Sequence, residues 1–346
     1  MTEPTVTILD VGHGNCAVLI DDKVVVIDAG PGTTLLDFLE KEGIHEVDVV
    51  LISHADEDHI KGLVSLLESQ TVTVQIIRIN SDALKSSPTW NDLTYLLDEA
   101  NKAGKIRFDV GLTTNQTGHF DTAAIKIEIL APSPGLAVKG PGSQDHKGRK
   151  LTSNSSSAVV RLLRDGRPLL LLPGDIDDTG LANLLESNSN ISAEIAVFPH
   201  HGGGPASTDL STFATSFCNA CKPEKLIFSI GRGKYDTPRP EIVVAARNRL
   251  PTARILCTQL SKHCASQLPG TNPVHLSDKV SKGREFRKCC AGTISITLDA
   301  KQTSVLPVLK AHGDFIASSA PTALCMKDQS LVSQMNSATV SENRST

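Results

Sequence analysis

The six residues His54-Ala55-Asp56-Glu57-Asp58-His59 constrain this chain more than any other segment. They follow the apolar run 47–53, which predicts a buried strand, and precede the run 62–67, which predicts a helix. Four side chains of metal-binding type, His54, Asp56, Asp58 and His59, therefore crowd one strand-to-helix turn. Imidazoles and carboxylates this close repel one another unless cations lie among them, and such ligands suit zinc, manganese or iron. The segment predicts a metal site, and its ligand density disfavours the alternative of a solvated polar loop.

Composition restricts the classes of function. A net charge of −4 argues against a protein that coats nucleic acid through bulk electrostatics, and 3% aromatic residues leave little material for stacking on single strands. No apolar stretch approaches the ~20 residues that span a bilayer, and the first residues lack the positive charge of a secretory signal. We expect a cytoplasmic protein without membrane spans, whose eight cysteines are reduced thiols or metal ligands.

Predicted strands and helices alternate along the chain, and hairpins such as the one around Asp165-Gly166 are frequent. This pattern favours a layered α/β sandwich built from two similar halves. We expect one domain over residues 1–314, with an insertion at about 258–290 that cysteines flank. Residues 315–346 are rich in Ser, Ala and Thr without periodicity and predict a disordered tail.

Further ligands are expected where other predicted strands end. Asp175 follows the run 168–172 and a Pro-Gly pair, and its carboxylate is our candidate for a bridge between two cations. His200 and His201 follow the predicted strand 194–198. Adjacent imidazoles point in different directions, so we expect one to bind metal and the other to face the substrate. An ordinary turn and two structural histidines are the alternatives for each segment taken alone.

Together these segments resemble the metallo-β-lactamase fold, and within it the soluble hydrolase domain of ComEC-like DNA-uptake proteins and their stand-alone relatives. The resemblance covers about residues 5–300 and lies in the stretches 9–15, 26–30, 53–63, 154–163, 172–175, 198–202 and 235–241. It implies an α/β fold, the metallo-β-lactamase-type αββα sandwich of two mixed sheets with outer helices. It also implies a metal-dependent hydrolase.

The resemblance implies two divalent metal ions, zinc or manganese. His54 and Asp56 would bind one ion, and Asp58 and His59 the other. Asp175 would lie between the ions and His200 would complete the second site. Asp28 would orient the metal loop without touching metal.

The chain departs from the family pattern at several positions. Asp56 replaces the second histidine of His-x-His-x-Asp-His, as it does in ComEC-like members, and the extra carboxylate makes manganese a rival to zinc. The family's third histidine has no counterpart, and Asn154 occupies that region. Thr237 replaces a histidine near residue 235, and Gly12-His13-Gly14-Asn15 stands where relatives have Gly-Gln-Gly-Asp.

A dinuclear centre of this kind lowers the pKa of a bound water and neutralises charge in the transition state. We expect Asp58 to accept a hydrogen bond from the attacking hydroxide and His201 or Tyr235 to protonate the leaving group. Two segments, 139–150 and 278–288, each carry an excess of three positive charges, which favours an anionic phosphodiester substrate such as DNA or RNA. Solvated surface loops are the alternative for both segments.

The sequence therefore favours a metal-dependent phosphodiesterase or nuclease. A catalytically silent binding protein that kept the fold is one alternative, and an ester, lactone or amide hydrolase with the same ligands is another. A separate hypothesis concerns the cysteines at the two ends of the insertion, Cys257, Cys264, Cys289 and Cys290. They would form a structural zinc site if the flanking segments are neighbours, with buried free thiols as the alternative.

Overall fold

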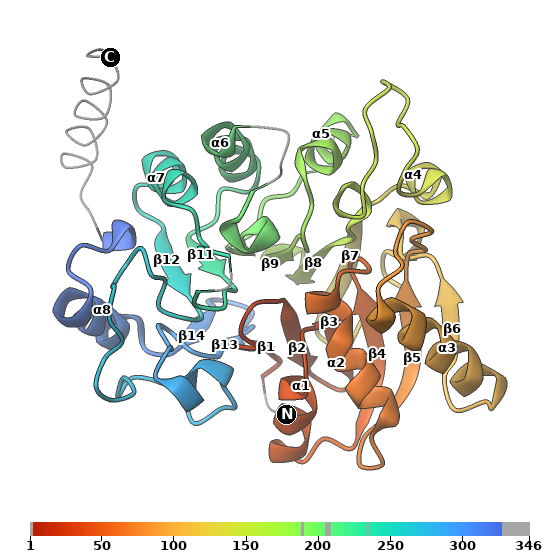
Figure 1. Ribbon diagram of the computed structural model, residues 1–346, viewed down its shortest axis with the longest axis horizontal. Helices are drawn as coiled ribbons and strands as arrows, with labels where there is room; N and C mark the ends of the chain where they lie inside the picture. The colour runs from red at the N-terminus through yellow and green to blue at the C-terminus, as the bar shows by residue number, and fades with distance from the viewer. Residues whose placement is uncertain (1–2, 188–189, 205–208, 234, 327–346) are drawn as a thin grey trace.

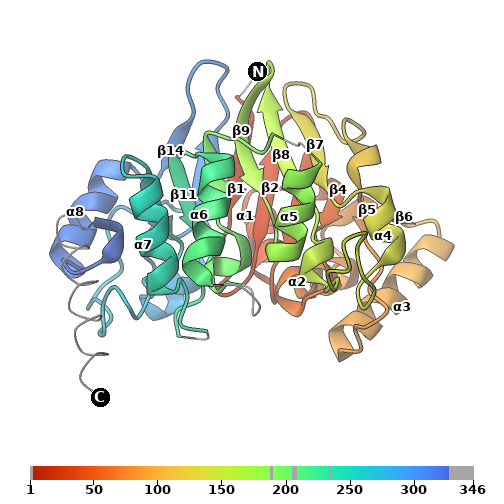
Figure 2. The same cartoon turned by 90° about the horizontal axis from the view of Figure 1, so that it is seen from above.

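The computed structural model describes residues 3–187, 190–204, 209–233 and 235–326. Two β-sheets lie face to face, and helices cover the outer surface of each sheet (Figures 1 and 2). This arrangement confirms the predicted αββα sandwich of two mixed sheets with outer helices.

The first sheet contains the N-terminal strands and receives the last two strands of the chain. Its strands are β1 (Thr5–Ile8), β2 (Cys16–Ile20), β3 (Val24–Ala29), β4 (Glu46–Ile52), β5 (Thr73–Ile79), β6 (Arg107–Val110), β13 (Ile294–Thr297) and β14 (Ser304–Leu306). They lie in the order β14-β13-β1-β2-β3-β4-β5-β6. The strands from β3 to β6 are parallel, so the loops that follow β3 and β4 leave the sheet at the same edge.

The second sheet repeats the pattern of an antiparallel start followed by parallel strands. Its strands are β7 (Lys126–Ala131), β8 (Val159–Arg164), β9 (Arg167–Leu172), β10 (Ile195–Val197), β11 (Lys225–Phe228) and β12 (Arg254–Cys257), in the order β12-β11-β10-β9-β8-β7. The predicted hairpin joins β8 to β9 through Asp165 and Gly166, which both have positive φ (51° and 76°) as tight hairpin turns require.

Helices pack on the outer faces of both sheets. In Figure 1, α1 (Thr34–Lys41), α2 (Glu57–Glu68) and α3 (Pro88–Lys102) cover the first sheet, while α5 (Asp178–Glu186), α6 (Leu210–Cys221) and α7 (Pro240–Arg249) cover the second. The short α4 (Pro134–Lys139) lies near β7, and α8 (Leu309–Ser319) lies beside β12. One apolar cluster fills the space between the sheets. A second cluster lies between the first sheet and its helices, and a third between the second sheet and its helices.

Helix α2 is held unusually close to the end of β3. The Gly62 amide donates to the Gly30 carbonyl at 2.7 Å, and a Cβ at Gly62 would lie only 2.1 Å from the Ala29 carbonyl oxygen. Only glycine permits this approach. It fixes the first turn of α2, which carries Asp58 and His59, relative to β3.

Two regions differ from the sequence prediction. Helix α6 was not expected, although the Asp209 side chain caps it and its buried Phe213 and Phe217 have helical spacing. The fold also continues past the expected end at residue 314, through the rest of α8 and a 3₁₀ turn, η5 (Leu324–Met326). Ile316 and Ala320 are buried there, and this packing orders a segment that composition alone assigned to the tail. Residues 327–346 of that expected tail lie outside the described residues.

Candidate metal centre

The side chains predicted to bind metal lie on loops that directly follow strands of both sheets. Residues 54–59 span the loop after β4 and the first turn of α2, the loop after β9 carries Asp175, and the turn after β10 carries His200 and His201. The turn before Asp175 is tight, because a Cβ at Gly174 (φ 54°) would lie 2.3 Å from the Ser157 hydroxyl oxygen. This turn keeps the carboxylate of Asp175 buried beneath the two sheet edges.

Four of these residues form one compact group. Ligand atoms of Asp58, His59, Asp175 and His201 all lie within 4.8 Å of one another. His59 Nε2 is 3.2 Å from Asp175 Oδ1, and His201 Nε2 is 3.2 Å from Asp58 Oδ2 and 3.4 Å from Asp175 Oδ2. Two nitrogens and two carboxylate oxygens at this spacing match the ligand number and type of a tetrahedral zinc or related cation.

The imidazoles of this group are oriented as metal ligands are. His59 Nδ1 donates to Asp28 Oδ2 at 2.8 Å, as the role expected for Asp28 requires, and His201 Nδ1 donates to the Ser229 carbonyl at 2.8 Å. Within the described part of the chain, the buried Nε2 atom of each ring makes no hydrogen bond of normal geometry. Buried nitrogens rarely lack a partner, and a second-nitrogen hydrogen bond to a carboxylate or carbonyl is typical of metal-binding histidines. The residues present therefore fit a divalent cation.

The pKa values of these four residues also support a cation site. Burial opposes charge on His201, but the carboxylates of Asp175 and Asp58 outweigh it and raise the pKa of His201 to about 9. Against the same burial, Asp175 and Asp28 raise the pKa of His59 well above its ordinary value. Burial favours the neutral acids, yet the neighbouring imidazoles lower the pKa of both Asp175 and Asp58. Two protons thus balance two carboxylates, and one divalent cation can replace both protons without changing the net charge.

The other predicted ligand pair, His54 and Asp56, lies beside this group but not within it. The two side chains are 3.8 Å apart, and Lys85 Nζ lies 2.5 Å from Asp56 Oδ1. The His54 ring is 4.2 Å from the His59 ring, and its Nε2 has no hydrogen-bond partner among the described residues. Burial, followed by the charge on His59, lowers the pKa of His54. The structure therefore gathers one ion site outright and leaves the second position partly filled by a lysine.

The two adjacent histidines lie at different distances from the compact group, and the nearer one is His201, not His200 as expected. His201 is buried and belongs to the compact group, whereas His200 lies at its edge. His200 Nδ1 is 3.1 Å from Asp175 Oδ2 and 3.3 Å from Asn154 Nδ2. Both histidines have positive φ (51° and 54°), which sends successive side chains in directions that strand or helix spacing does not foretell. Asn154 thus contacts the site through His200.

A residue that the sequence reasoning did not select, His13, also faces the centre. Its Nε2 lies 3.4 Å from Asp58 Oδ2, and its ring is 4.3 Å from the His201 ring and 4.4 Å from the Tyr235 ring. The signal was the Gly12-His13-Gly14-Asn15 segment, one of the stretches in which the sequence departs from the pattern that the resemblance implied. Tyr235 itself is 56% exposed, so its ring reaches solvent at the rim.

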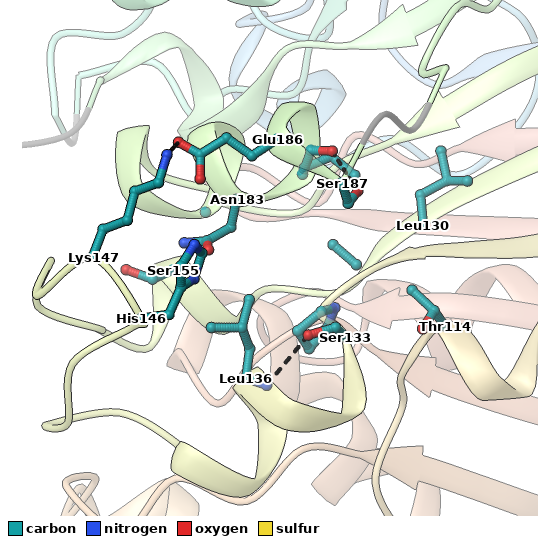
Figure 3. A pocket seen from close by; sticks show the side chains of 14 residues that line it. Thr114, Leu130, Ser133, Leu136, His146, Lys147, Ser155, Asn183, Glu186 and Ser187 are labelled. Carbon is teal, nitrogen blue, oxygen red and sulfur yellow. Dashed lines mark hydrogen bonds and ion pairs between the residues drawn. The ribbon is translucent and has the colours of Figure 1, made fainter.

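An open cleft of about 490 Å³ gives access to the metal centre. Besides His13, Tyr235 and members of the compact group, Thr237 and Arg239 line it. Figure 3 shows a second cavity, of about 600 Å³, between α5, α4 and the end of β7, where Lys147 Nζ pairs with Glu186 Oε1 at 2.9 Å.

The two basic segments do not supply unpaired charge to the cleft. Arg149 Nε pairs with Asp145 Oδ2 at 2.6 Å, and its terminal nitrogens bind Glu186 at 2.9 and 3.0 Å. In the later segment Lys279 pairs with Glu42. Neither segment contributes to the cleft lining within the described residues. Carboxylates from outside the segments, Glu186 and Glu42, offset part of their positive excess. Arg239 is the arginine that lines the cleft among the described residues.

The four cysteines proposed for a structural zinc do not converge as predicted. Cys289 Sγ turns toward Asp10 Oδ2 at 3.6 Å, whereas Cys290 Sγ turns toward His312 Nε2 at 3.3 Å. The two sulfurs therefore face different partners, which separates Cys289 from a site that includes Cys290.

None of the helices that the structure describes is long and apolar enough to cross a membrane.

Residues 9–138 match the model of the Metallo-beta-lactamase superfamily. Competence protein ComA of Neisseria gonorrhoeae is 24% identical over 265 residues, which are 75% of this chain and 31% of ComA. ComE operon protein 3 of Bacillus subtilis is 23% identical over 213 residues, or 60% of this chain and 23% of that protein. The chain thus spans under a third of the length of either relative.

Among solved structures, the metallo-beta-lactamase fold protein YhfI of Bacillus subtilis aligns with a TM-score of 0.45 at 12% identity, covering 74% of this chain and 96% of YhfI. The family match includes the metal loop after β4 and the strands β2 to β6 that support it. Residues 9–138 are thus similar to the Metallo-beta-lactamase superfamily, and the chain has the two-sheet metallo-beta-lactamase fold with a candidate His/Asp metal site.

Proposed function

We propose that this protein is a metal-dependent phosphodiesterase whose substrate is the backbone of a nucleic acid, DNA or RNA. The observation that carries the metal chemistry is the pair of buried Nε2 atoms on His59 and His201, which face Asp58 and Asp175 without hydrogen bonds of normal geometry. The distant similarity to two competence proteins, and the resemblance to DNA-uptake hydrolases, favour a nucleic acid over other substrates.

In this proposal the compact group holds one divalent cation, and a second cation binds beside His54 and Asp56 when Lys85 moves away. A bound cation supplies a water of lowered pKa and neutralises charge that develops on phosphoryl oxygens. Because divalent binding requires neutral imidazoles, His59 and His201 release their protons as the ion enters. The mixed nitrogen and oxygen ligands suit zinc and manganese alike.

The remaining residues position the reactants. Asp58 is placed to accept a hydrogen bond from the attacking water, because its side chain is 20% exposed toward the cleft while Asp175 is buried. Tyr235, at the rim beside His13, is our candidate for the proton donor to the leaving oxygen. This assigns His201 to metal binding and leaves Tyr235 alone in the role first shared between them.

Arg239 supports a phosphodiester substrate. Arg239 lines the cleft, its side chain is 44% exposed, and its Nε lies 4.0 Å from the Glu241 carboxylate. A guanidinium presents a planar fork of donors that matches the oxygens of a phosphate. We therefore propose that Arg239 binds a non-bridging oxygen of the substrate.

The test is a substrate panel with zinc-loaded and manganese-loaded protein. Single-stranded DNA, duplex DNA, RNA and bis(p-nitrophenyl) phosphate are compared with a lactone and a thioester. We expect turnover of the phosphodiesters that is lost in His201→Ala and kept in His119→Ala, since His119 is exposed and outside the cleft. Arg239→Ala should raise KM for nucleic acid.

Other outcomes would redirect the assignment. Turnover of the lactone or thioester alone would identify an ester or amide type of hydrolase with the same ligands. Less than one equivalent of bound metal, with no turnover of any compound, would identify a silent binding protein.

A further inference from the structure

Four cysteines from distant parts of the chain meet at the end of β12. Cys257 ends β12, Cys264 lies in the loop that follows, Cys290 returns from the insertion, and Cys325 lies in η5. The Ala291 amide donates to the Cys257 carbonyl at 2.9 Å, which keeps the strand-like segment of Cys290 beside β12. We call these four residues the thiol cluster. Cys257, Cys264 and Cys290 belong to the zinc site that the sequence suggested, whereas Cys325 does not.

The thiol cluster surrounds a small cavity. Cys257, Cys264 and Cys325 line a cavity of about 20 Å³. Cys290 is buried in the same apolar cluster as Cys257, and Cys264 and Cys325 pack against that cluster. About 10–15 Å³ of such volume suffices for one water molecule, so this cavity is large enough for a single ion. Three of the residues that line this cavity are cysteines, and His263 lines it as well.

The sulfurs are close enough to influence one another. Burial raises the pKa of the Cys257 thiol, and charge on Cys290, Cys264 or Cys325 would raise it further. Burial also raises the pKa of Cys264 to about 12. The eight cysteines all lie in described segments and none forms a disulfide there. Neutral thiols that crowd one another in this way can release protons together to a cation that takes up their charge.

We propose that Cys257, Cys264, Cys290 and Cys325 bind one zinc ion, which fastens the C-terminal turn η5 to the second sheet. Thiolate ligands select zinc and other soft cations, and four of them complete a closed tetrahedral site of structural type. Binding requires the thiol side chains to turn toward the cavity, because among the described residues only the Asp58 group already holds three or more ligand atoms within 4.8 Å of one another.

The surroundings suit a negatively charged zinc-thiolate centre. Arg247 donates to the Cys325 carbonyl, and Arg254 Nη2 donates to the Leu309 carbonyl at 3.1 Å, at the start of α8. Both arginines lower the pKa of Cys325 against the effect of burial. Two guanidinium groups therefore compensate for the two negative charges that four thiolates and one zinc ion leave.

Cobalt substitution tests this site separately from the hydrolase centre. The full-length protein is purified with reductant, stripped of metal and titrated with Co²⁺. Cobalt bound by thiolates gives an intense sulfur-to-metal charge-transfer band in the near ultraviolet, whereas the His/Asp centre has no sulfur ligand and gives none. We expect the band in the wild type, with one equivalent of zinc displacing the cobalt that gives rise to it.

Two variants and a matched control identify the ligands. Cys264→Ser and Cys325→Ser, at partly exposed positions, should lose the band and one equivalent of zinc, while hydrolysis is kept. Cys289→Ser should keep both, because its sulfur turns toward Asp10. Absence of the band in the wild type, its persistence in both variants, or a disulfide between cluster members in the reduced protein would overturn the proposal.

Discussion

Replacing Asp28 by asparagine should weaken metal binding without removing a metal ligand. Asp28 Oδ1 accepts from the Ser53 amide at 2.7 Å, and Oδ2 accepts from the Ser53 hydroxyl at 2.8 Å and from His59 Nδ1 at 2.8 Å. Asparagine has the same shape and tolerates the positive φ of 57° at this position. If the amide oxygen keeps the Ser53 amide bond, its NH₂ group faces His59 Nδ1.

That NH₂ group is a donor, so it favours the His59 tautomer that carries its proton on Nε2. This is the nitrogen that must be free of a proton to bind metal. Loss of such a supporting carboxylate typically costs about 10–100-fold in metal affinity. The corresponding free energy is about 1.4–2.8 kcal/mol, in the range of about 1.5–3 kcal/mol for a hydrogen bond to a charged group. We therefore expect the Kd for zinc to rise by roughly one to two orders of magnitude.

The assay is a competition titration of zinc against a chelator of known affinity, followed by hydrolysis at saturating metal. Asp48→Asn is the matched control, because Asp48 accepts from the Val24 amide at 2.7 Å on the same sheet and lies outside the cleft. Thermal unfolding of both metal-free variants checks that the fold is kept. A Kd for Asp28→Asn within about twofold of the wild type would refute the tautomer argument.

Three further outcomes follow from the geometry. Gly62→Ala should destabilise the fold by about 1–3 kcal/mol in chemical denaturation, because its Cβ would lie 2.1 Å from the Ala29 carbonyl oxygen, and an unchanged midpoint would contradict that contact. The raised pKa of His201, about 9, means that the metal-free ring is charged below that pH. The pKa of His59 is raised as well, so affinity for zinc should keep rising with pH up to at least about 9, with protons released in a weakly buffered calorimetric titration. Lys85→Ala should raise the affinity for a second ion beside Asp56, measured by elemental analysis at increasing metal concentration, and an unchanged stoichiometry would show that the lysine does not compete.

Much of the fold and part of the site were predictable, because strand ends are local features. The loop from His54 to His59 and the turn at Asp175 follow apolar runs that must be buried, so their side chains had to leave the sheets at an edge. Parallel strand order then brings such edges together. Asp28, in contrast, was placed by the resemblance to known proteins and not by its local sequence.

The parts that were missed depend on long-range contacts or on unusual backbone angles. Adjacent histidines gave no hint that His201 and not His200 enters the compact group, since both have positive φ. His13 sits far from the metal loop in sequence and reaches Asp58 only through the packing of β1 against its neighbours. Cys325 joins the thiol cluster because α8 folds back onto β12, which its Ser- and Ala-rich composition concealed.

The compact group takes Asp58 and His59 from the first half of the sandwich and Asp175 and His201 from the second. An ion in this position would crosslink two layers that also meet through apolar contacts and hydrogen bonds such as the one from the Ala158 amide to the Ser53 carbonyl. Chelation should therefore loosen the two layers from one another before either one unravels. By the same reasoning, a fragment limited to residues 9–138 would carry half of a coordination sphere and would hold no ion firmly.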